Sequence, residues 1–264
     1  PTLYTDKLMD SVNADDNLRD TIVVYATIKG HAAQRYPENG TLFVTSLFKV
    51  LSVASGFCKD IFRVLRNVQR ELLMDEYPQL MEFTSYGVDD MLSLKPPTHI
   101  RGNDQRTGAL CIEVNYLFCG LQDERSGSLW DGYDLLDLFL QEKVIFQFLN
   151  ETTVNQSLIA SIKDVIEQYA SRYNILLLFI MSHGVVEKGK LYLKDSRGSK
   201  IAVDDILDLL QDTNSPSLKG KQKLVFVQVC RGGATISHDL KTTSQTKSTS
   251  NDSEKKKNSD LSKR

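Results

Sequence analysis

Residues 175–184 read ILLLFIMSHG, and residues 224–232 read LVFVQVCRG. Each stretch begins with a nearly continuous apolar run and ends in a short polar motif that contains a glycine. Apolar runs of this kind are typical of strands that are buried on both faces of a parallel sheet. Since functional residues collect beyond the carboxyl ends of such strands, His183 and Cys230 are the first candidates for a site.

The rest of the chain alternates between strand and helix patterns. The predicted strands are residues 21–27, 91–94, 109–118, 144–150, 175–181 and 224–229, with a hairpin at 190–201. The predicted helices are residues 41–55, 59–73, 129–142, 155–173 and 203–210. Trp130 is expected to anchor the start of one helix against the sheet. The alternation predicts an α/β fold with a mostly parallel central sheet and helices on both faces.

Composition divides the chain into four parts. Residues 1–19 and 234–264 are polar, and they are expected to be flexible linker segments because they cannot bury enough apolar surface to offset their ordering entropy. Between them lie two regions that are expected to be ordered, residues 20–97 and 98–233.

Charge and cysteine usage exclude several classes of protein. The 264 residues include 32 Lys and Arg against 34 Asp and Glu, so binding to nucleic acid or to an anionic membrane by bulk charge is not expected. No apolar run approaches the ~20 residues of a membrane span, and Pro1 opens no signal-peptide pattern. The four cysteines are widely spaced, which indicates reduced thiols in a cytoplasmic protein, with no metal site and no cofactor.

A thiol and an imidazole at the ends of neighbouring parallel strands can meet in space. Cysteine is a strong nucleophile near neutral pH, and a nearby histidine can deprotonate it and then protonate a leaving amine. The N–H groups of Gly184 and Cys230 would form an oxyanion hole for the same reaction. Taken alone, a strand-end cysteine is more often a packing residue and a lone histidine more often structural, so the prediction depends on the pair.

The two motifs resemble those of the caspase family. His183 precedes Cys230 by 47 positions, and FIMSHG at 179–184 looks like the histidine motif of that family. QVCRG at 228–232 is similar to its nucleophile pentapeptide, with Val229 at a position that is usually alanine.

Two further segments resemble the same family. ERSGSLWD at 124–131 is similar to the Arg-x-Gly-Thr-x-x-Asp segment of the caspase large subunit, with Ser128 in place of threonine. YATIKGHAAQRYPENGTLFVTSL at 25–47 resembles a small-subunit segment, in a variant that looks more like initiator than executioner caspases.

The resemblance implies a caspase-like three-layer sandwich and a cysteine endopeptidase that cleaves after aspartate in apoptosis or immune signalling. It implies that Arg125 and Arg35 bind the aspartate carboxylate, with Gln228 between them; the alternative for each arginine is a solvated loop position. It also implies a zymogen with autocatalytic cleavage, and a homodimer of large/small heterodimers that pair through a strand near Met91–Leu94. The expected partners are protein substrates and adaptor or inhibitor proteins.

Three alternatives stay open at this point. The small-subunit-like region precedes the large-subunit-like region, so either the chain is circularly permuted or two processed subunits are joined in one sequence. Val229 and the small and polar residues at 31–34 leave room for a catalytically weak regulator that binds active caspases. A protease of the wider clan that cuts after Arg or Lys would need acidic residues where Arg125 and Arg35 stand.

Overall fold

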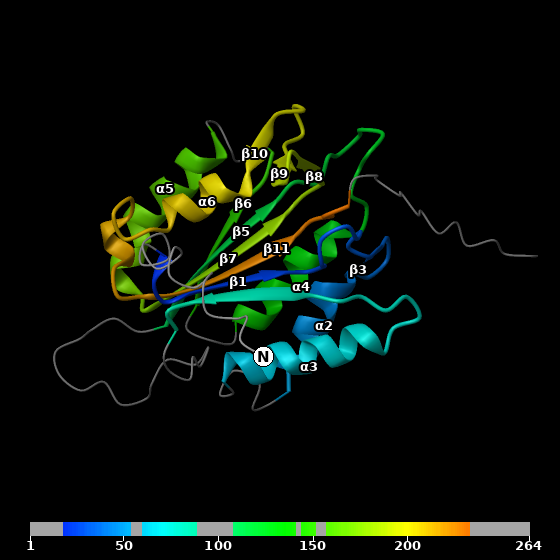
Figure 1. Ribbon diagram of the computed structural model, residues 1–264, viewed down its shortest axis with the longest axis horizontal. Coiled ribbons are helices and arrows are strands. Elements are labelled where there is room, and N and C mark those ends of the chain that lie inside the picture. The colour runs from blue at the N-terminus through cyan, green and yellow to red at the C-terminus, as the bar shows by residue number, and fades with distance from the viewer. Residues whose placement is uncertain (1–17, 54–59, 89–107, 141–143, 152–156, 233–264) are drawn as a thin grey trace, which may run out of the picture.

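The computed structural model describes residues 18–53, 60–88, 108–140, 144–151 and 157–232. Its centre is a six-stranded sheet in the order β4-β1-β11-β7-β5-β6 (Figure 1). In that order the strands span Glu82–Tyr86, Thr21–Tyr25, Gln222–Gln228, Ile175–Met181, Ala109–Asn115 and Val144–Leu149. Every neighbouring pair is parallel except β1 with β4. The two sequence regions therefore contribute strands to one sheet.

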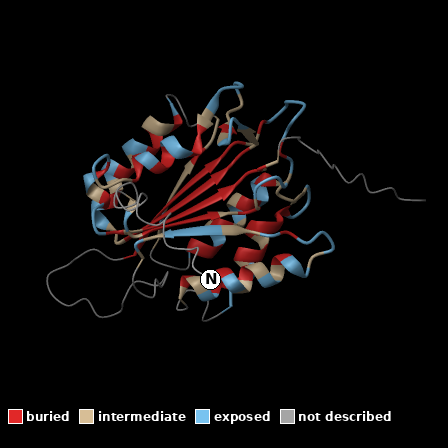
Figure 2. Ribbon diagram, in the orientation of Figure 1, coloured by how far each residue is buried: buried red, intermediate tan, exposed pale blue. Residues whose placement is uncertain are grey.

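Helices cover both faces of this sheet, which confirms the predicted α/β fold. One face carries α2, α3 and α4, which span Leu42–Leu51, Ile61–Leu73 and Ser128–Leu140. The other carries α5, α6 and two 3₁₀ turns, η3 and η4, which span Leu158–Tyr169, Val203–Leu209, Ala170–Arg172 and Pro216–Leu218. Figure 2 shows the central strands as an almost wholly buried layer between the helices.

Strand β7 explains why its sequence is apolar at every position. Its side chains alternate between the two faces, and each face is covered by helices, so both sets are buried. Leu177, Phe179 and Met181 belong to the core under α2 to α4, and Leu176, Leu178 and Ile180 belong to the core under α5 and α6.

The helices begin and pack as their sequences indicate. Thr41 caps α2, since its hydroxyl accepts a hydrogen bond from the Val44 N–H at 3.4 Å. In α3 the apolar stripe predicted from the 3.6-residue period is fully buried. It consists of Ile61, Val64, Leu65, Val68 and Leu72.

Smaller elements complete the fold. The predicted hairpin is part of a three-stranded sheet of β8, β9 and β10, which span Gly184–Glu187, Lys190–Lys194 and Lys200–Ala202. Strands β2 and β3, at Arg35–Tyr36 and Gly40–Thr41, form a short pair. Strand β4 was not predicted, and the expected strand at Met91–Leu94 lies outside the described residues, as does the 97/98 boundary.

One prediction about a side chain is wrong. Trp130 does not anchor α4 against the sheet, because 51% of its surface is exposed and its ring packs edge-on against Tyr133. The buried face of α4 is instead formed by Ser128, Asp131, Leu135, Leu138 and Phe139.

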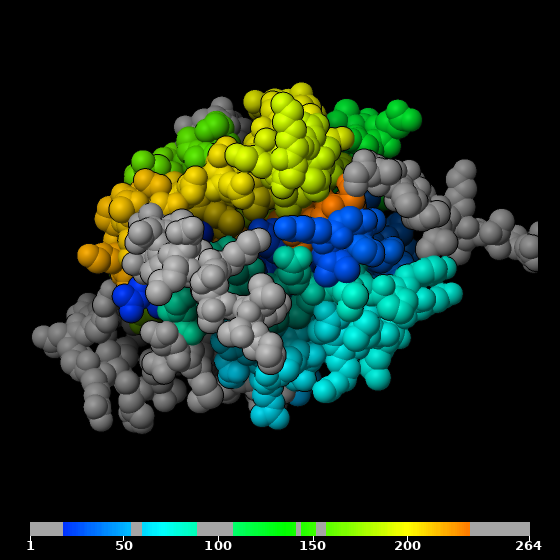
Figure 3. Space-filling model, in the orientation of Figure 1, coloured from blue at the N-terminus to red at the C-terminus, as the bar shows by residue number. Residues whose placement is uncertain are grey.

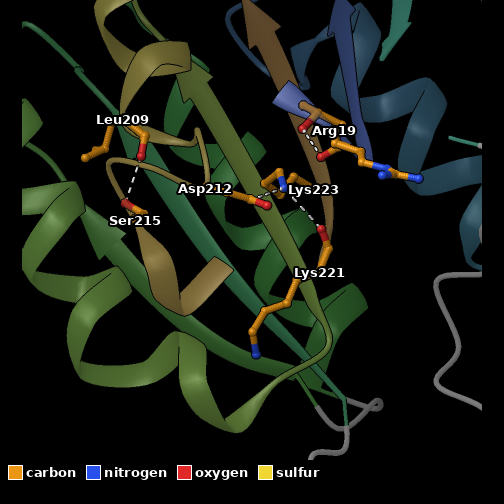
Figure 4. Close-up of polar contacts among 7 residues, drawn as sticks. Arg19, Leu209, Asp212, Ser215, Lys221 and Lys223 are labelled. Carbon is orange, nitrogen blue, oxygen red and sulfur yellow. Dashed lines mark hydrogen bonds and ion pairs between the residues drawn. The ribbon is translucent and has the colours of Figure 1, made fainter. Parts of the chain in front are cut away.

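The amino end of the sheet buries two lysines. The Lys221 ammonium donates to the carbonyl oxygens of Ala170 and Tyr173, at the end of α5. Lys223 is fully buried, and its ammonium lies 3.5 Å from Asp212 and 3.3 Å from the Lys221 carbonyl (Figure 4). Main-chain oxygens therefore compensate the Lys221 charge, whereas Lys223 is compensated by the Asp212 carboxylate and one main-chain oxygen.

Candidate functional site

The register of β7 and β11 brings His183 and Cys230 to the same end of the sheet. Met181 pairs with Gln228, and each candidate residue follows its strand's paired residue by two positions. Gly184 lies directly against the backbone of Cys230, since a Cβ on Gly184 would be 2.1 Å from the Cys230 carbonyl oxygen. Only glycine allows the two backbone segments to approach this closely. Figure 3 shows this end of β11, in orange, at the surface between yellow and blue segments of the chain.

The imidazole of His183 is held by two contacts. Its Nε2 lies 2.5 Å from the Asp123 carbonyl oxygen, which can only accept, so Nε2 carries the hydrogen and Nδ1 is the free acceptor. The ring also meets the edge of the Phe118 ring, with centroids 4.7 Å apart. Burial lowers the pKa of His183, and the positive charges of Arg125 and Arg35 lower it further, although the Asp123 contact acts in the opposite direction. The imidazole is therefore neutral near pH 7 and able to act as a base.

Cys230 is half-buried and has a free thiol. Main-chain hydrogen bonds join its segment to the loop after β1: the Arg231 N–H donates to His31 O at 2.9 Å, and the Gly30 N–H donates to Arg231 O at 2.8 Å. Val229 is 1% exposed and belongs to the core under α5 and α6, so its extra methyl groups are accommodated there.

The Arg231 side chain anchors the residue after the cysteine. Its guanidinium lies over the Tyr25 ring, 4.1 Å from the centroid, and Nη1 donates to Thr27 O at 3.0 Å and to Glu82 Oε2 at 2.9 Å. Arg231 is buried, so its charge needs this compensation. Glu82 belongs to β4, and the contact thus links the cysteine segment to the edge of the sheet.

The candidate specificity residues lie beside the same strand ends. Arg125 is 3% exposed, and its Nη1 donates to Asn115 Oδ1 at 2.9 Å and to Tyr116 O at 2.7 Å. Arg125 Nε and Gln228 Oε1 are buried with no hydrogen-bond partner among the described residues. Burial, followed by repulsion from half-buried Arg35, lowers the pKa of Arg125 to about 9. This position therefore favours an anionic ligand.

A buried polar network ties the segment that carries Arg35 to the segment that carries Arg125. Asp131 Oδ1 accepts from the Thr41 N–H at 2.7 Å and from the Thr41 hydroxyl at 3.0 Å. Gly40 provides the space, because a Cβ there would be 2.5 Å from that oxygen. Burial raises the pKa of Asp131 to about 6, although the hydrogen bonds from Thr41 act against this shift.

Comparison with known proteins identifies the family. The family model of the caspase domain matches residues 6–90 and 106–263. The chain belongs to the caspase family. It is 29% identical over 152 residues to Cell death protein 3 of Caenorhabditis remanei, an alignment that covers 54% of this chain and 29% of that protein. It is 36% identical over 77 residues to Caspase drICE of Drosophila melanogaster, covering 26% of this chain and 21% of that protein.

The chain therefore spans less than a third of the length of these caspase relatives. A crystal structure of the Drosophila initiator caspase Dronc is similar with a TM-score of 0.45 and 22% identity, covering 55% of this chain and 61% of that one. None of the helices among the described residues is both long and apolar enough to cross a membrane. In the same part of the caspase chain, no cluster of three or more His, Cys, Asp or Glu side chains could hold a metal ion.

Of the six residues that the sequence singled out, Gln228 ends β11, and His183, Gly184 and Cys230 follow the ends of β7 and β11. Arg125 and Arg35 lie close enough for their positive charges to lower the pKa of His183, although Arg35 belongs to the separate β2–β3 pair. Sequence reasoning missed the Asp123 carbonyl and the Phe118 ring that hold the imidazole. A main-chain carbonyl has no residue signature, and only the position of Asp123, two residues before Arg125, connects it with a motif.

Proposed function

We propose that this caspase-family chain is a cysteine endopeptidase that cleaves peptide bonds after aspartate. The observation that carries the proposal is the placement of His183 and Cys230 at equal offsets beyond two adjacent parallel strands, with Gly184 packed on the Cys230 backbone. The family match supports the protease class.

In the proposed mechanism, His183 Nδ1 takes the proton of the Cys230 thiol, and the thiolate attacks the carbonyl carbon of the scissile bond. The N–H groups of Gly184 and Cys230 stabilise the negative oxygen of the tetrahedral intermediate. The intermediate collapses as His183 gives its proton to the leaving amine. Water, deprotonated by His183, then hydrolyses the thioester and restores the thiol.

Specificity for aspartate follows from the charges beside this pair. Arg125 and Arg35 supply positive charge at a site where Arg125 is almost completely buried, and the unpartnered Arg125 Nε supports a ligand that accepts a hydrogen bond there. A carboxylate meets both requirements, whereas a substrate Arg or Lys would face like charges.

The biological setting and assembly are part of the same proposal. The name of Cell death protein 3 supports a role in cell death. We further propose that the chain acts in the cytoplasm on protein substrates, with adaptor or inhibitor proteins as partners. Pairing of two large/small heterodimers through the strand expected near Met91–Leu94 stays part of the proposal; in the described part of the sheet, the antiparallel edge strand is β4, whose three central residues are exposed. An unpaired edge of this kind is a ready template for symmetric pairing. The uncleaved chain would be a zymogen, and cleavage within residues 1–19 or 234–264 would activate it.

A panel of fluorogenic peptides that end in Asp, Asn, Glu, Arg or Lys tests the proposal. We expect cleavage after Asp only, with Asn cleaved at least 100-fold more slowly because it cannot pair with the two charges, and no cleavage by folded Cys230→Ala. Equal rates for Asp and Asn would refute the arginine pocket, and cleavage after Arg or Lys would support the wider clan. A folded but inactive wild-type chain that binds an active caspase would favour the regulator that Val229 left open.

A further inference from the structure

Glu151 lies two residues after β6, at the end of the sheet that carries the candidate site. Its carboxylate accepts hydrogen bonds from two consecutive N–H groups: Leu117 N lies 3.1 and 3.0 Å from Oε1 and Oε2, and Phe118 N lies 2.8 Å from Oε1. Both N–H groups belong to the segment that follows β5, the parallel neighbour of β6. Because a charged acceptor strengthens such bonds, Glu151 fixes this backbone from an adjacent strand end.

The backbone that Glu151 holds is in an unfavourable conformation. Phe118 has a φ of 58°, in the left-handed region that a residue with a Cβ rarely adopts. The residue is also 2% exposed, so its N–H group requires a protein partner. Glu151 supplies that partner, and a conformation of this kind persists only where its surroundings enforce it.

The left-handed turn sets the position of the imidazole in two ways. It places the Phe118 ring against the His183 ring. It also starts the loop that returns to Asp123, whose carbonyl accepts from His183 Nε2, and the loop closes where the Arg125 N–H donates to Leu117 O at 2.9 Å. Both contacts of the imidazole thus depend on the residues that Glu151 holds.

We infer that Glu151 is a positioning residue that acts through the left-handed turn at Phe118 to hold the His183 imidazole in one orientation, with Nδ1 directed to the thiol. The inference rests on the proposed function, in which His183 is the general base. Glu151 does not touch the reacting atoms in this arrangement, and its effect passes through the Phe118 ring and the Asp123 carbonyl.

The surroundings of Glu151 leave room for water to take the place of the carboxylate. Glu151 lines a cavity of about 260 Å³ together with Tyr116, Asp195 and Arg197. Most of the residues that line the cavity have polar side chains, and it is large enough for several water molecules, which can hydrate the freed N–H groups in Glu151→Ala. Water binds these groups without the negative charge, so the turn is less strongly held.

The test compares Glu151→Ala and Glu151→Gln with Ser215→Ala, in the full chain. Ser215 is a matched control because its hydroxyl donates to Leu209 O at 2.7 Å, a buried contact at the far end of the sheet (Figure 4). The first readout is the NMR titration of His183, which is resolvable because the chain has only four histidines. The second is kcat and its pH profile with an Asp peptide.

We expect the pKa of His183 to shift in Glu151→Ala, because burial, which lowers this pKa, and the Asp123 contact, which raises it, both depend on the turn that Glu151 holds. The acid limb of the kcat profile should move in the same direction, and kcat should fall about 10- to 100-fold. KM should change less, since the Arg125 guanidinium keeps its hydrogen bonds to Asn115 and Tyr116, although the Glu151 charge also acts on Arg125. Glu151→Gln retains one acceptor oxygen and should show the same changes at smaller size.

An unchanged His183 titration in a folded Glu151 variant overturns the inference, whatever the activity, and so does an altered titration with unchanged kcat. If Glu151→Ala does not fold, the result with Glu151→Gln decides. If the wild-type chain cleaves no peptide, the proposed function fails, whereas the NMR titration still decides whether Glu151 holds the imidazole. A change of equal size in Ser215→Ala would also count against the inference.

Discussion

Replacing Glu113 by glutamine should flatten the pH dependence of the free energy of unfolding. Glu113 lies in the middle of β5 with no exposed surface, and its Oε2 has no hydrogen-bond partner among the described residues. Burial raises its pKa to about 8, and the nearby Asp131 charge adds to the shift, whereas the hydrogen bond from Asn115 opposes it. Glutamine has nearly the same shape and does not ionise.

The sign and size of the effect follow from proton linkage. The unfolded glutamate titrates near pH ~4.3, so between that pH and about 8 the folded state of the protein binds more protons than the unfolded state. The stabilisation is complete below ~4.3 and is lost as the pH rises through this window. From pH 5 to pH 7 the loss is about 2.5 kcal/mol at ~1.4 kcal/mol per pKa unit. Asp131 shifts in the same direction, and the variant isolates the part due to Glu113.

Urea unfolding followed by far-UV circular dichroism at pH 5, 6 and 7 measures this difference. Between pH 5 and pH 7, wild type should lose about 2.5 kcal/mol more than Glu113→Gln. Glu167→Gln is the control, since Glu167 is an exposed residue of α5 and should leave the slope unchanged. Equal slopes in wild type and Glu113→Gln would refute the reasoning, because the carboxyl group would then titrate alike in the folded and unfolded states.

Two further substitutions test the geometry around the cysteine. Gly184→Ala should lower kcat about 100-fold or more in peptide assays and cost about 3 kcal/mol in urea unfolding, because its Cβ would displace the Cys230 backbone; wild-type values would show that the backbone yields freely. Glu82→Ala should lower the free energy of unfolding in urea by about 1–3 kcal/mol, because it leaves buried Arg231 without its carboxylate partner. This range allows for solvent screening, since the Glu82 side chain is 38% exposed. Glu71→Ala, which loses the pair with Lys49, is the control and should cost less than ~1 kcal/mol, because the Lys49 side chain is 69% exposed; equal losses would contradict the role of the buried cation.

The elements that the sequence predicted best are those whose pattern is set by burial alone. Strand β7 was predicted at 175–181 and forms at Ile175–Met181, because a strand covered on both faces has to be apolar throughout. Helix α3 was predicted in the same way, from one apolar stripe that becomes its buried face. Such patterns are local, and they survive whatever the tertiary arrangement is.

Other features depend on contacts that no local pattern contains. Strand β4 reads EFTSY, its central residues are exposed, and it is a strand only because β1 supplies hydrogen-bond partners on one side. Trp130 was assigned to the core because it is large and apolar, yet the core-facing positions of α4 fall on the opposite side of the helix. Both cases are decided by which face of an element meets the sheet.

The polar groups buried at the carboxyl end of the sheet lie within segments whose sequence predicts ordinary strands and loops. Glu113 and Asn115 interrupt an apolar strand, and Arg125 follows in an exposed loop, yet all three are buried in the folded protein. Hydrogen bonds among the three offset part of the cost of burying them: Asn115 donates to Glu113 and accepts from Arg125. A core built only for stability would replace such groups by apolar residues, since burying a charge is costly even when it is paired. Asn115 ends β5 and holds the Arg125 guanidinium beside the strand ends that precede His183 and Cys230, and the proposed binding of a substrate carboxylate would give this buried charge a function.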